Sequence, residues 1–178
     1  MLAFHFSSQG IYFWQTEGEV PKPDPGIYML DLDNPTQGPK ELLIEGGFLE
    51  QTPDFVPHGL GHWIMENGSV ILYVINHRKG KDFVESFYYD PEHLSLRHRK
   101  SFSHPLLREI NDIVLVALDE FYITNDHYFD VEILKIIETY SRLPWSTVTY
   151  YNDITQEAKI VAKGLSYANG IAMSNNRR

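Results

Sequence analysis

A long repeat in the pattern of strands and turns constrains this chain more than any other feature. Four segments with an apolar start, followed by a turn and a second strand where the chain allows it, begin at Leu2, Leu60, Ile113 and Ile171. Successive starts lie about 55 residues apart, and each full interval holds roughly four short strands. A repeat of this length built from four strands is typical of one blade of a β-propeller.

Within the repeats, β-branched and aromatic residues alternate with polar residues over short runs. Such runs predict strands over residues 71–76, 83–89, 121–125, 147–151 and 159–164. The Asn67-Gly68 pair predicts a hairpin turn, and with Ser69 it also forms a glycosylation sequon. Residues 130–143 contain aliphatic side chains at mixed spacing before Pro144, which predicts one short helical insertion. The expected fold class is therefore all-β.

The number of repeats bears on the domain organisation. Propellers typically close with 4–8 blades, whereas residues 1–178 hold roughly three and begin a fourth. An open propeller leaves strand edges unpaired. We therefore expect 1–178 to form a partial β-propeller domain that belongs to a longer protein.

Composition excludes several classes of function. A net charge of -9 leaves no basic excess for binding nucleic acid. The absence of cysteine excludes Cys-based zinc sites, thiol catalysis and disulfides within the chain. No apolar run approaches the ~20 residues that span a bilayer, and the N-terminal apolar run is too short for a signal peptide. Neither a G-x-S-x-G elbow nor a phosphate-binding glycine loop is present.

Polar residues stand next to the starts of the inner strands expected in the repeats. Asn111 and Asn169 occupy equivalent repeat positions, and Asp112 follows Asn111. Oxygen atoms from successive blades converge on the axis of a propeller, where a backbone carbonyl of the turn at His58 to Leu60 would join them. Calcium prefers 6–8 such oxygen ligands. The alternative is that these side chains form turns and hydrogen bonds between blades.

Two pairs of residues are candidates for acid–base chemistry. His58 precedes one strand and His77 ends the next, so the two imidazoles are expected to approach each other and act as a general base pair. Asp126 stands directly before His127, and a neighbouring carboxylate can orient an imidazole. The alternative for His58 and His77 is hydrogen bonding to the backbone.

Six segments, in order and at plausible spacing, resemble one known family. They are PHGL (57–60), VINH (74–77), INDIV (110–114), FYITNDHYF (121–129), PWSTVTYY (144–151) and YANGIA (167–172). The chain resembles the paraoxonase/arylesterase family, which comprises secreted six-bladed β-propeller esterases and lactonases. The resemblance covers nearly the whole chain, from about Leu2 to Ser174.

The resemblance implies two calcium ions in the central channel. Asn111 and Asn169 would be ligands of a catalytic ion, while Asp112 and the backbone carbonyl of Leu60 would hold a structural ion. The family's further acidic ligands would precede Met1, and an Asp-Asn pair would follow Arg178. The family's terminal cysteines have no counterpart in this chain.

The resemblance also assigns roles to the remaining candidates. His58 matches the proposed general base that activates water and His77 its partner, while Asp126 and His127 match a second polar layer. The implied activity is calcium-dependent hydrolysis of aryl esters or lactones. The implied location is extracellular or membrane-associated, with membrane or lipoprotein association through a segment before Met1. The alternative is a non-catalytic propeller that acts as an interaction or chaperone-like module.

Overall fold

The computed structural model describes residues 2–5, 11–15, 26–78 and 80–174, and up to residue 15 it describes the backbone only. Strands dominate the described chain, and the helices are short. The elements are β1 Leu2–His5, β2 Ile11–Gln15, β3 Tyr28–Asp31, η1 Pro35–Gln37, β4 Lys40–Glu41, β5 Leu43–Glu45, α1 Phe48–Gln51, β6 Pro57–Ile64, β7 Val70–Arg78, β8 Lys81–Asp90, β9 Ser95–Phe102, β10 Ile110–Ala117, β11 Glu120–Asn125, α2 Glu132–Ser141, β12 Ser146–Asn152 and β13 Glu157–Leu165.

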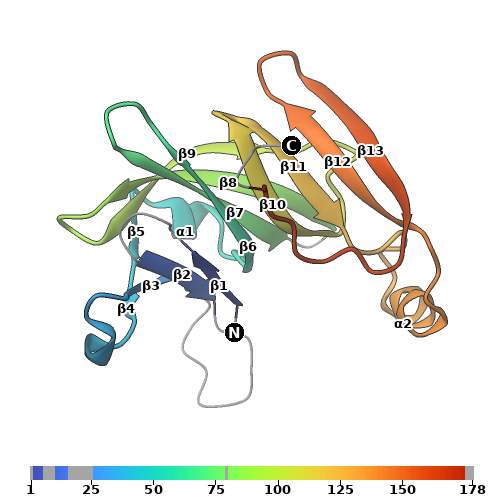
Figure 1. Ribbon diagram of the computed structural model, residues 1–178, viewed down its shortest axis with the longest axis horizontal. Coiled ribbons are helices and arrows are strands. Elements are labelled where there is room, and N and C mark those ends of the chain that lie inside the picture. The colour runs from blue at the N-terminus through green and yellow to red at the C-terminus, as the bar shows by residue number, and fades with distance from the viewer. Residues whose placement is uncertain (1, 6–10, 16–25, 79, 175–178) are drawn as a thin grey trace.

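The strands form three sheets that lie side by side (Figure 1). The first sheet has the order β1-β2-β3-β4, the middle sheet β5-β9-β8-β7-β6, and the third sheet β10-β11-β12-β13. Nearly all pairs are antiparallel neighbours in sequence. The exception is β5, which leads into the middle sheet by pairing parallel to β9 at its outer edge. No sheet closes on itself within the described residues, so the expectation of a partial all-β propeller is confirmed.

Successive side chains of a strand point to opposite faces of its sheet. The middle sheet is buried on both faces, because apolar side chains point to each of them. On β7, Leu72 and Val74 face a core shared with the first sheet. Their neighbours Ile71, Tyr73 and Ile75 face a second core shared with the third sheet. The continuous apolar run of β7 therefore reflects burial on two sides.

Two glycines on β6 let the innermost strands of the middle and third sheets approach closely. A Cβ atom at Gly59 would lie 2.4 Å from the Asn111 carbonyl oxygen and 2.9 Å from the Asp112 Cα. At Gly61 it would lie 2.6 Å from a methyl group of Leu115. Larger side chains would push β6 away from β10, and the backbone of β6 would no longer lie against Asn111 and Asp112.

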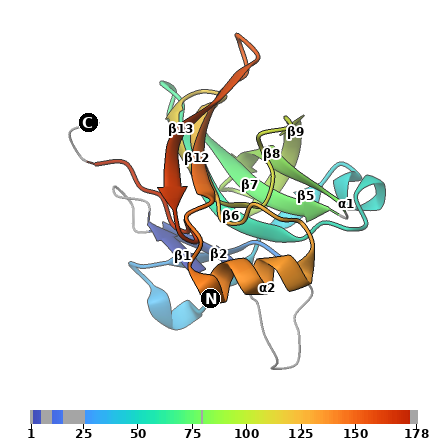
Figure 2. The same ribbon diagram turned by 90° about the vertical axis from the view of Figure 1, so that its right-hand side faces the viewer.

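All five predicted strands are present, inside β7, β8, β11, β12 and β13. The predicted turn at Asn67 also forms: its side-chain oxygen accepts a bond from the Ser69 amide at 3.0 Å, and Gly68 adopts a φ of 82°. The helical insertion is α2, which lies beyond one end of the third sheet (Figures 1 and 2). No helix in the described part of the chain is long and apolar enough to span a membrane.

The start of the fourth repeat does not form a strand in the described residues. The segment from Ser166 to Ser174 has no sheet partner, although the Ile171 amide donates to Asp112 Oδ2 at 2.9 Å. An inner strand pairs with the second strand of its own sheet, and no such strand follows within the described residues. Three of the four repeat starts therefore correspond to the strands β1, β6 and β10.

Candidate active site

Four of the predicted site residues line one cavity, which we call the mouth pocket. It has a volume of about 850 Å³ and lies where β6 and β10 begin and β7 and β11 end. His58, His77, Asp126 and His127 line it, and charged side chains surround them, namely Arg78, Lys81, Asp82, Arg108, Glu109, Asp130, Glu132 and Lys135. A site of this composition can bind a polar reacting group and transfer protons.

The hairpin of β6 and β7 brings the two histidines together. Pro57 pairs with Asn76, and the His77 amide donates to the Val56 carbonyl at 3.1 Å. The imidazole rings of His58 and His77 consequently meet edge to face, with their centroids 5.1 Å apart. The predicted approach of the two rings is observed, while their role as a general base pair stays a prediction.

Asp82 orients His77. The Nδ1 atom of His77 lies 2.8 Å from Asp82 Oδ1, and Asp82 Oδ2 accepts a hydrogen bond from the Ile110 amide at 3.0 Å. Burial by itself lowers the pKa of His77, but the hydrogen bond and charge of Asp82, with Asp126 and Glu109, raise it above its ordinary value. In neutral His77 a proton on Nδ1 points at Asp82, which leaves Nε2 as the basic atom.

Sequence reasoning missed Asp82, although a signal for it exists. His77 and Asp82 are direct cross-strand partners in the hairpin of β7 and β8, where Gly80 adopts a φ of 77°. A glycine-containing turn between them in the sequence fixes this register. Glu109, with a φ of 48°, was also missed and has no comparable signal, because its place depends on the packing of β10.

A hydrogen-bonded chain connects β10 to α2. The Asn111 amide nitrogen donates to Asp126 Oδ2 at 3.1 Å, and Asp126 Oδ1 lies 2.8 Å from His127 Nδ1. The other imidazole nitrogen of His127 lies 2.9 Å from the Thr139 hydroxyl. Because the Asn111 nitrogen faces Asp126, its amide oxygen points away from this carboxylate.

Asp112 follows Asn111 in a stretch of β10 where the pairing with β11 is irregular, and it is 5% exposed. Its two carboxylate oxygens accept hydrogen bonds from the backbone amides of Ile113 and Ile171, each at 2.9 Å. Burial raises the pKa of Asp112 to about 6, although both bonds act to lower it. A buried carboxylate whose described partners are backbone amides would gain stability from a cation.

Three of the four predicted calcium ligands are buried. Asn111 and Asp112 are 6% and 5% exposed, and Leu60 is 2% exposed on the strand that packs against them. An amide oxygen, a carboxylate and a backbone carbonyl are the donor types that calcium prefers. Asn169, by contrast, is exposed. None of these four described residues lines the mouth pocket, so their roles as calcium ligands stay predictions.

A further group of potential metal ligands consists of Glu109, Asp126 and His127, whose donor atoms lie within 4.8 Å of one another. Glu109 already forms a 2.6 Å ion pair with Lys135 from α2, and Asp126 accepts a bond from Asn111. Lys135 and Asn111 therefore already bind two of the three potential ligands. We assign Glu109, Asp126 and His127 to the positioning of α2.

Comparison with known proteins places the chain in a family. The arylesterase family model matches residues 3–178. The chain is 39% identical to rat serum paraoxonase/arylesterase 2 over 173 residues, which are 97% of this chain and 48% of that protein. It is 40% identical to the human serum paraoxonase/arylesterase 2 over 169 residues, covering 95% and 47%.

Rabbit serum paraoxonase/lactonase 3 is similar at 35% identity over 173 residues, which are 97% of this chain and 48% of that relative. The chain thus spans about half the length of these curated relatives. A match over nearly the whole chain, together with three propeller-like sheets, supports one conclusion: the chain belongs to the arylesterase family.

Proposed function

We propose that this chain carries part of the active site of a calcium-dependent hydrolase of aryl esters or lactones. The observation that carries the proposal is the His58–His77 pair, with ring centroids 5.1 Å apart, in a cavity beside the buried Asn111-Asp112 pair. The names of the relatives, arylesterase and lactonase, support the same substrate class.

The two histidines would supply the base. His58 takes a proton from a water molecule that attacks the carbonyl carbon. Its neighbour His77, held by Asp82 with Nε2 as the basic atom, accepts this proton or stabilises the imidazolium of His58. The carboxylate of Asp82 stabilises the positive charge that develops on the pair.

The buried oxygens would hold the cation. Asn111 and Asn169 would bind a catalytic calcium ion, and Asp112 with the Leu60 carbonyl a second, structural ion. Bound calcium would polarise the ester carbonyl and stabilise the oxyanion of the tetrahedral intermediate. The hydrogen bond from the Asn111 amide nitrogen to Asp126 supports this role, because it directs the amide oxygen away from the Asp126 carboxylate.

Calorimetric titration with calcium and hydrolysis of phenyl acetate in the same samples test the proposal. We expect calcium binding by the parent chain and turnover that depends on it. His58→Gln should reduce turnover by about 10²–10⁴-fold with calcium binding retained. Asp112→Asn should weaken calcium binding itself.

A matched control is His93→Gln, since His93 is an exposed imidazole paired with Asp90. It should leave both binding and turnover unchanged. Turnover that persists without calcium, or that is equal in His58→Gln and the parent chain, would contradict the proposed mechanism.

A second candidate function is association with a lipid surface, and an apolar face on and next to α2 favours it. Val131, Ile133, Ile136, Ile137 and Tyr140 are all between 49% and 86% exposed. Sedimentation with phosphatidylcholine vesicles should deplete the parent chain from solution. Ile133→Gln with Ile136→Gln should abolish this depletion; no depletion of the parent chain would reject the idea.

A further inference from the structure

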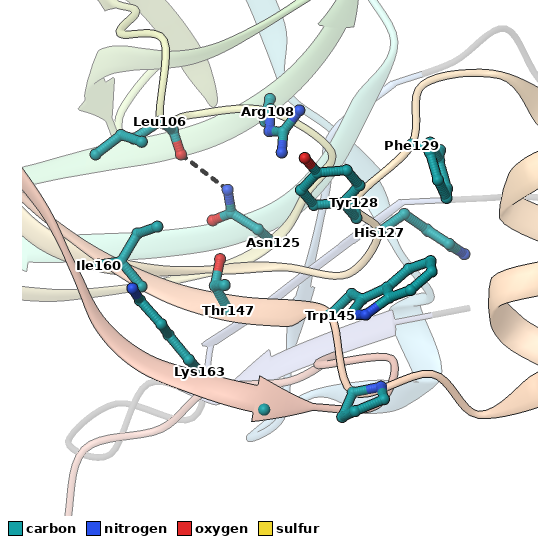
Figure 3. A pocket seen from close by; sticks show the side chains of 12 residues that line it. Leu106, Arg108, Asn125, His127, Tyr128, Phe129, Trp145, Thr147, Ile160 and Lys163 are labelled. Carbon is teal, nitrogen blue, oxygen red and sulfur yellow. Dashed lines mark hydrogen bonds between the residues drawn. The ribbon is translucent and has the colours of Figure 1, made fainter.

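A second cavity, which we call the side pocket, lies next to the mouth pocket. It has a volume of about 540 Å³, within the range of pockets that hold small molecules. Asn125 from β11, Thr147 from β12, and Ile160 and Lys163 from β13 form one side of it (Figure 3). Residues on the connection before β10 and on both sides of α2 form the rest, including Leu106, Arg108, Tyr128 and Trp145.

Asn125 gives this pocket an unsatisfied hydrogen-bond acceptor. The side chain is buried, with 5% of Asn125 exposed, and its amide nitrogen donates to the Leu106 carbonyl at 2.8 Å. Its Oδ1 atom has no hydrogen-bond partner among the described residues. The amide cannot be reversed, because the Leu106 carbonyl can only accept. A buried acceptor of this kind lowers the stability of the folded chain unless a donor reaches it.

The Oδ1 atom is directed into the pocket. Figure 3 shows it pointing away from Leu106, toward the space beside Ile160 and Thr147. Neither the Thr147 hydroxyl nor a backbone amide satisfies it in the described structure. A ligand with a hydroxyl donor would fill this requirement.

The walls favour an aromatic or other apolar body. Tyr128 and Trp145 lie beside each other, with ring centroids 6.0 Å apart and the rings tilted edge to face. Ile160 borders the opposite side of the Asn125 amide (Figure 3). Apolar and aromatic walls with few polar groups are typical of small-molecule sites.

The charges at the pocket select against cations. Lys163 and Arg108 line it, and both are exposed; the Arg108 guanidinium also stacks on Tyr128 at 4.7 Å. Among the described residues that form the lining there is no aspartate or glutamate. In a chain with a net charge of -9, a pocket whose charged residues are cationic offers a local site for an anion.

We propose that the side pocket binds aromatic hydroxycarboxylic acids. The ligand ring lies between the Trp145 and Ile160 walls, and its hydroxyl donates to Asn125 Oδ1. The carboxylate lies at the rim, where Lys163 and Arg108 supply positive charge. This site is separate from the histidine pair and does not depend on hydrolysis in the mouth pocket.

The test is calorimetric titration of the 178-residue chain with 4-hydroxyphenylacetate, in the presence of EDTA so that calcium plays no part. Phenylacetate and 4-methoxyphenylacetate keep the ring and the charge but lack the donor. Each should bind about three- to tenfold more weakly. The neutral 4-hydroxyphenylacetamide should bind more weakly than 4-hydroxyphenylacetate, because it lacks the negative charge that Lys163 and Arg108 attract.

Variants locate the binding. Asn125→Leu should bind 4-hydroxyphenylacetate and phenylacetate equally, because the acceptor is gone while Thr149 Oγ1, at 3.5 Å, still reaches the Leu106 carbonyl. Lys163→Gln should weaken binding of the carboxylate about two- to fivefold and leave binding of the amide unchanged. The matched control is Lys159→Gln on the same strand, whose ammonium lies over Tyr150 at 5.1 Å and which does not line the pocket.

Far-UV circular dichroism confirms that each variant is folded. If Asn125→Leu does not fold, the ligand series and Lys163→Gln still decide the question, because they leave Asn125 intact. Equal affinity of the parent chain for 4-hydroxyphenylacetate and phenylacetate would overturn the proposal. So would unchanged carboxylate binding in Lys163→Gln or the absence of any binding.

Discussion

At the scale of single residues, Asp82 determines the chemistry of the histidine pair. The substitution Asp82→Asn keeps an acceptor for the Ile110 amide but removes the charge next to His77. We expect the pKa of His77 to fall, and proton NMR titration of its imidazole measures this directly. The His93 imidazole, paired with Asp90, should titrate as before; a fall at both histidines would argue against a local effect.

The same pair affects stability in a defined pH window. The pKa of His77 is raised in the folded chain, so its interaction with Asp82 stabilises the fold fully below the unfolded pKa of about 6.5. That contribution is lost as the pH rises through the folded pKa. The destabilisation by Asp82→Asn should accordingly be larger in urea unfolding at pH 5 than at pH 9.

Asp119 joins the middle and third sheets through side-chain bonds. Arg99 binds its carboxylate in a bidentate manner at 2.7 and 2.6 Å, and the Tyr73 hydroxyl donates to it at 2.6 Å. Burial alone raises the pKa of Asp119, but these bonds outweigh burial and place its pKa below the usual range. This stabilisation is present above pH ~4 and is lost as the pH falls through the folded pKa.

The substitution Asp119→Asn tests this contribution, since asparagine tolerates the φ of 59° at this position. We expect the free energy of unfolding to fall by about 1.5–3 kcal/mol at pH 7. The difference should shrink below pH ~4, as measured by urea unfolding across this range. Asp33→Asn, at an exposed position, is the control; an equal loss there would refute the assignment.

At the scale of elements, the distance between β6 and β10 depends on glycine. Gly59→Ala would place a methyl group against the Asn111 carbonyl, and overpacking of this kind costs about 1–3 kcal/mol. Gly170→Ala is the matched control, because its nearest neighbour, Asp112 Oδ2, lies at 3.8 Å. Thermal unfolding should show a lower melting temperature for the first variant only, and an unchanged melting temperature for Gly59→Ala would contradict close packing of these strands.

In helix α2 the pattern of burial is the reverse of the one that its sequence predicts. Its isoleucines are exposed, whereas Glu138 is 3% exposed and accepts hydrogen bonds from the Tyr128 and Phe129 amides. The aliphatic residues of the segment predict a helix. Its orientation follows instead from Glu138 and from the ion pair between Lys135 and Glu109.

At the scale of the whole molecule, aromatic packing couples the middle and third sheets. Phe121 is fully buried and stacks on Tyr151 at 5.1 Å, while Phe102 meets it edge to face at 5.8 Å. Phe121→Ala should cost about 3–5 kcal/mol. Amide hydrogen exchange should then accelerate in β7 and β11 together, because both sheets share this core.

The neighbouring Tyr122 provides the control, since it lies on the other face of β11, against Tyr150. Tyr122→Ala should destabilise the chain less and should not accelerate exchange in β7. Faster exchange confined to β11 in Phe121→Ala would show that the two sheets unfold independently.

The sequence by itself determined five of the strands, the Asn67 turn, the short helix, the family and the meeting of His58 with His77. Alternation and turn chemistry act over a few residues, and the hairpin of β6 and β7 converts them directly into proximity. The tertiary structure alone decided that Asn111 faces Asp126 while Asp112 faces Ile171, and that Asn125 retains an unsatisfied oxygen. These contacts join strands of the third sheet to the segments that precede β10 and follow β11 and β13. Their geometry depends on how those segments pack against the sheet, and no local pattern in the chain encodes that packing.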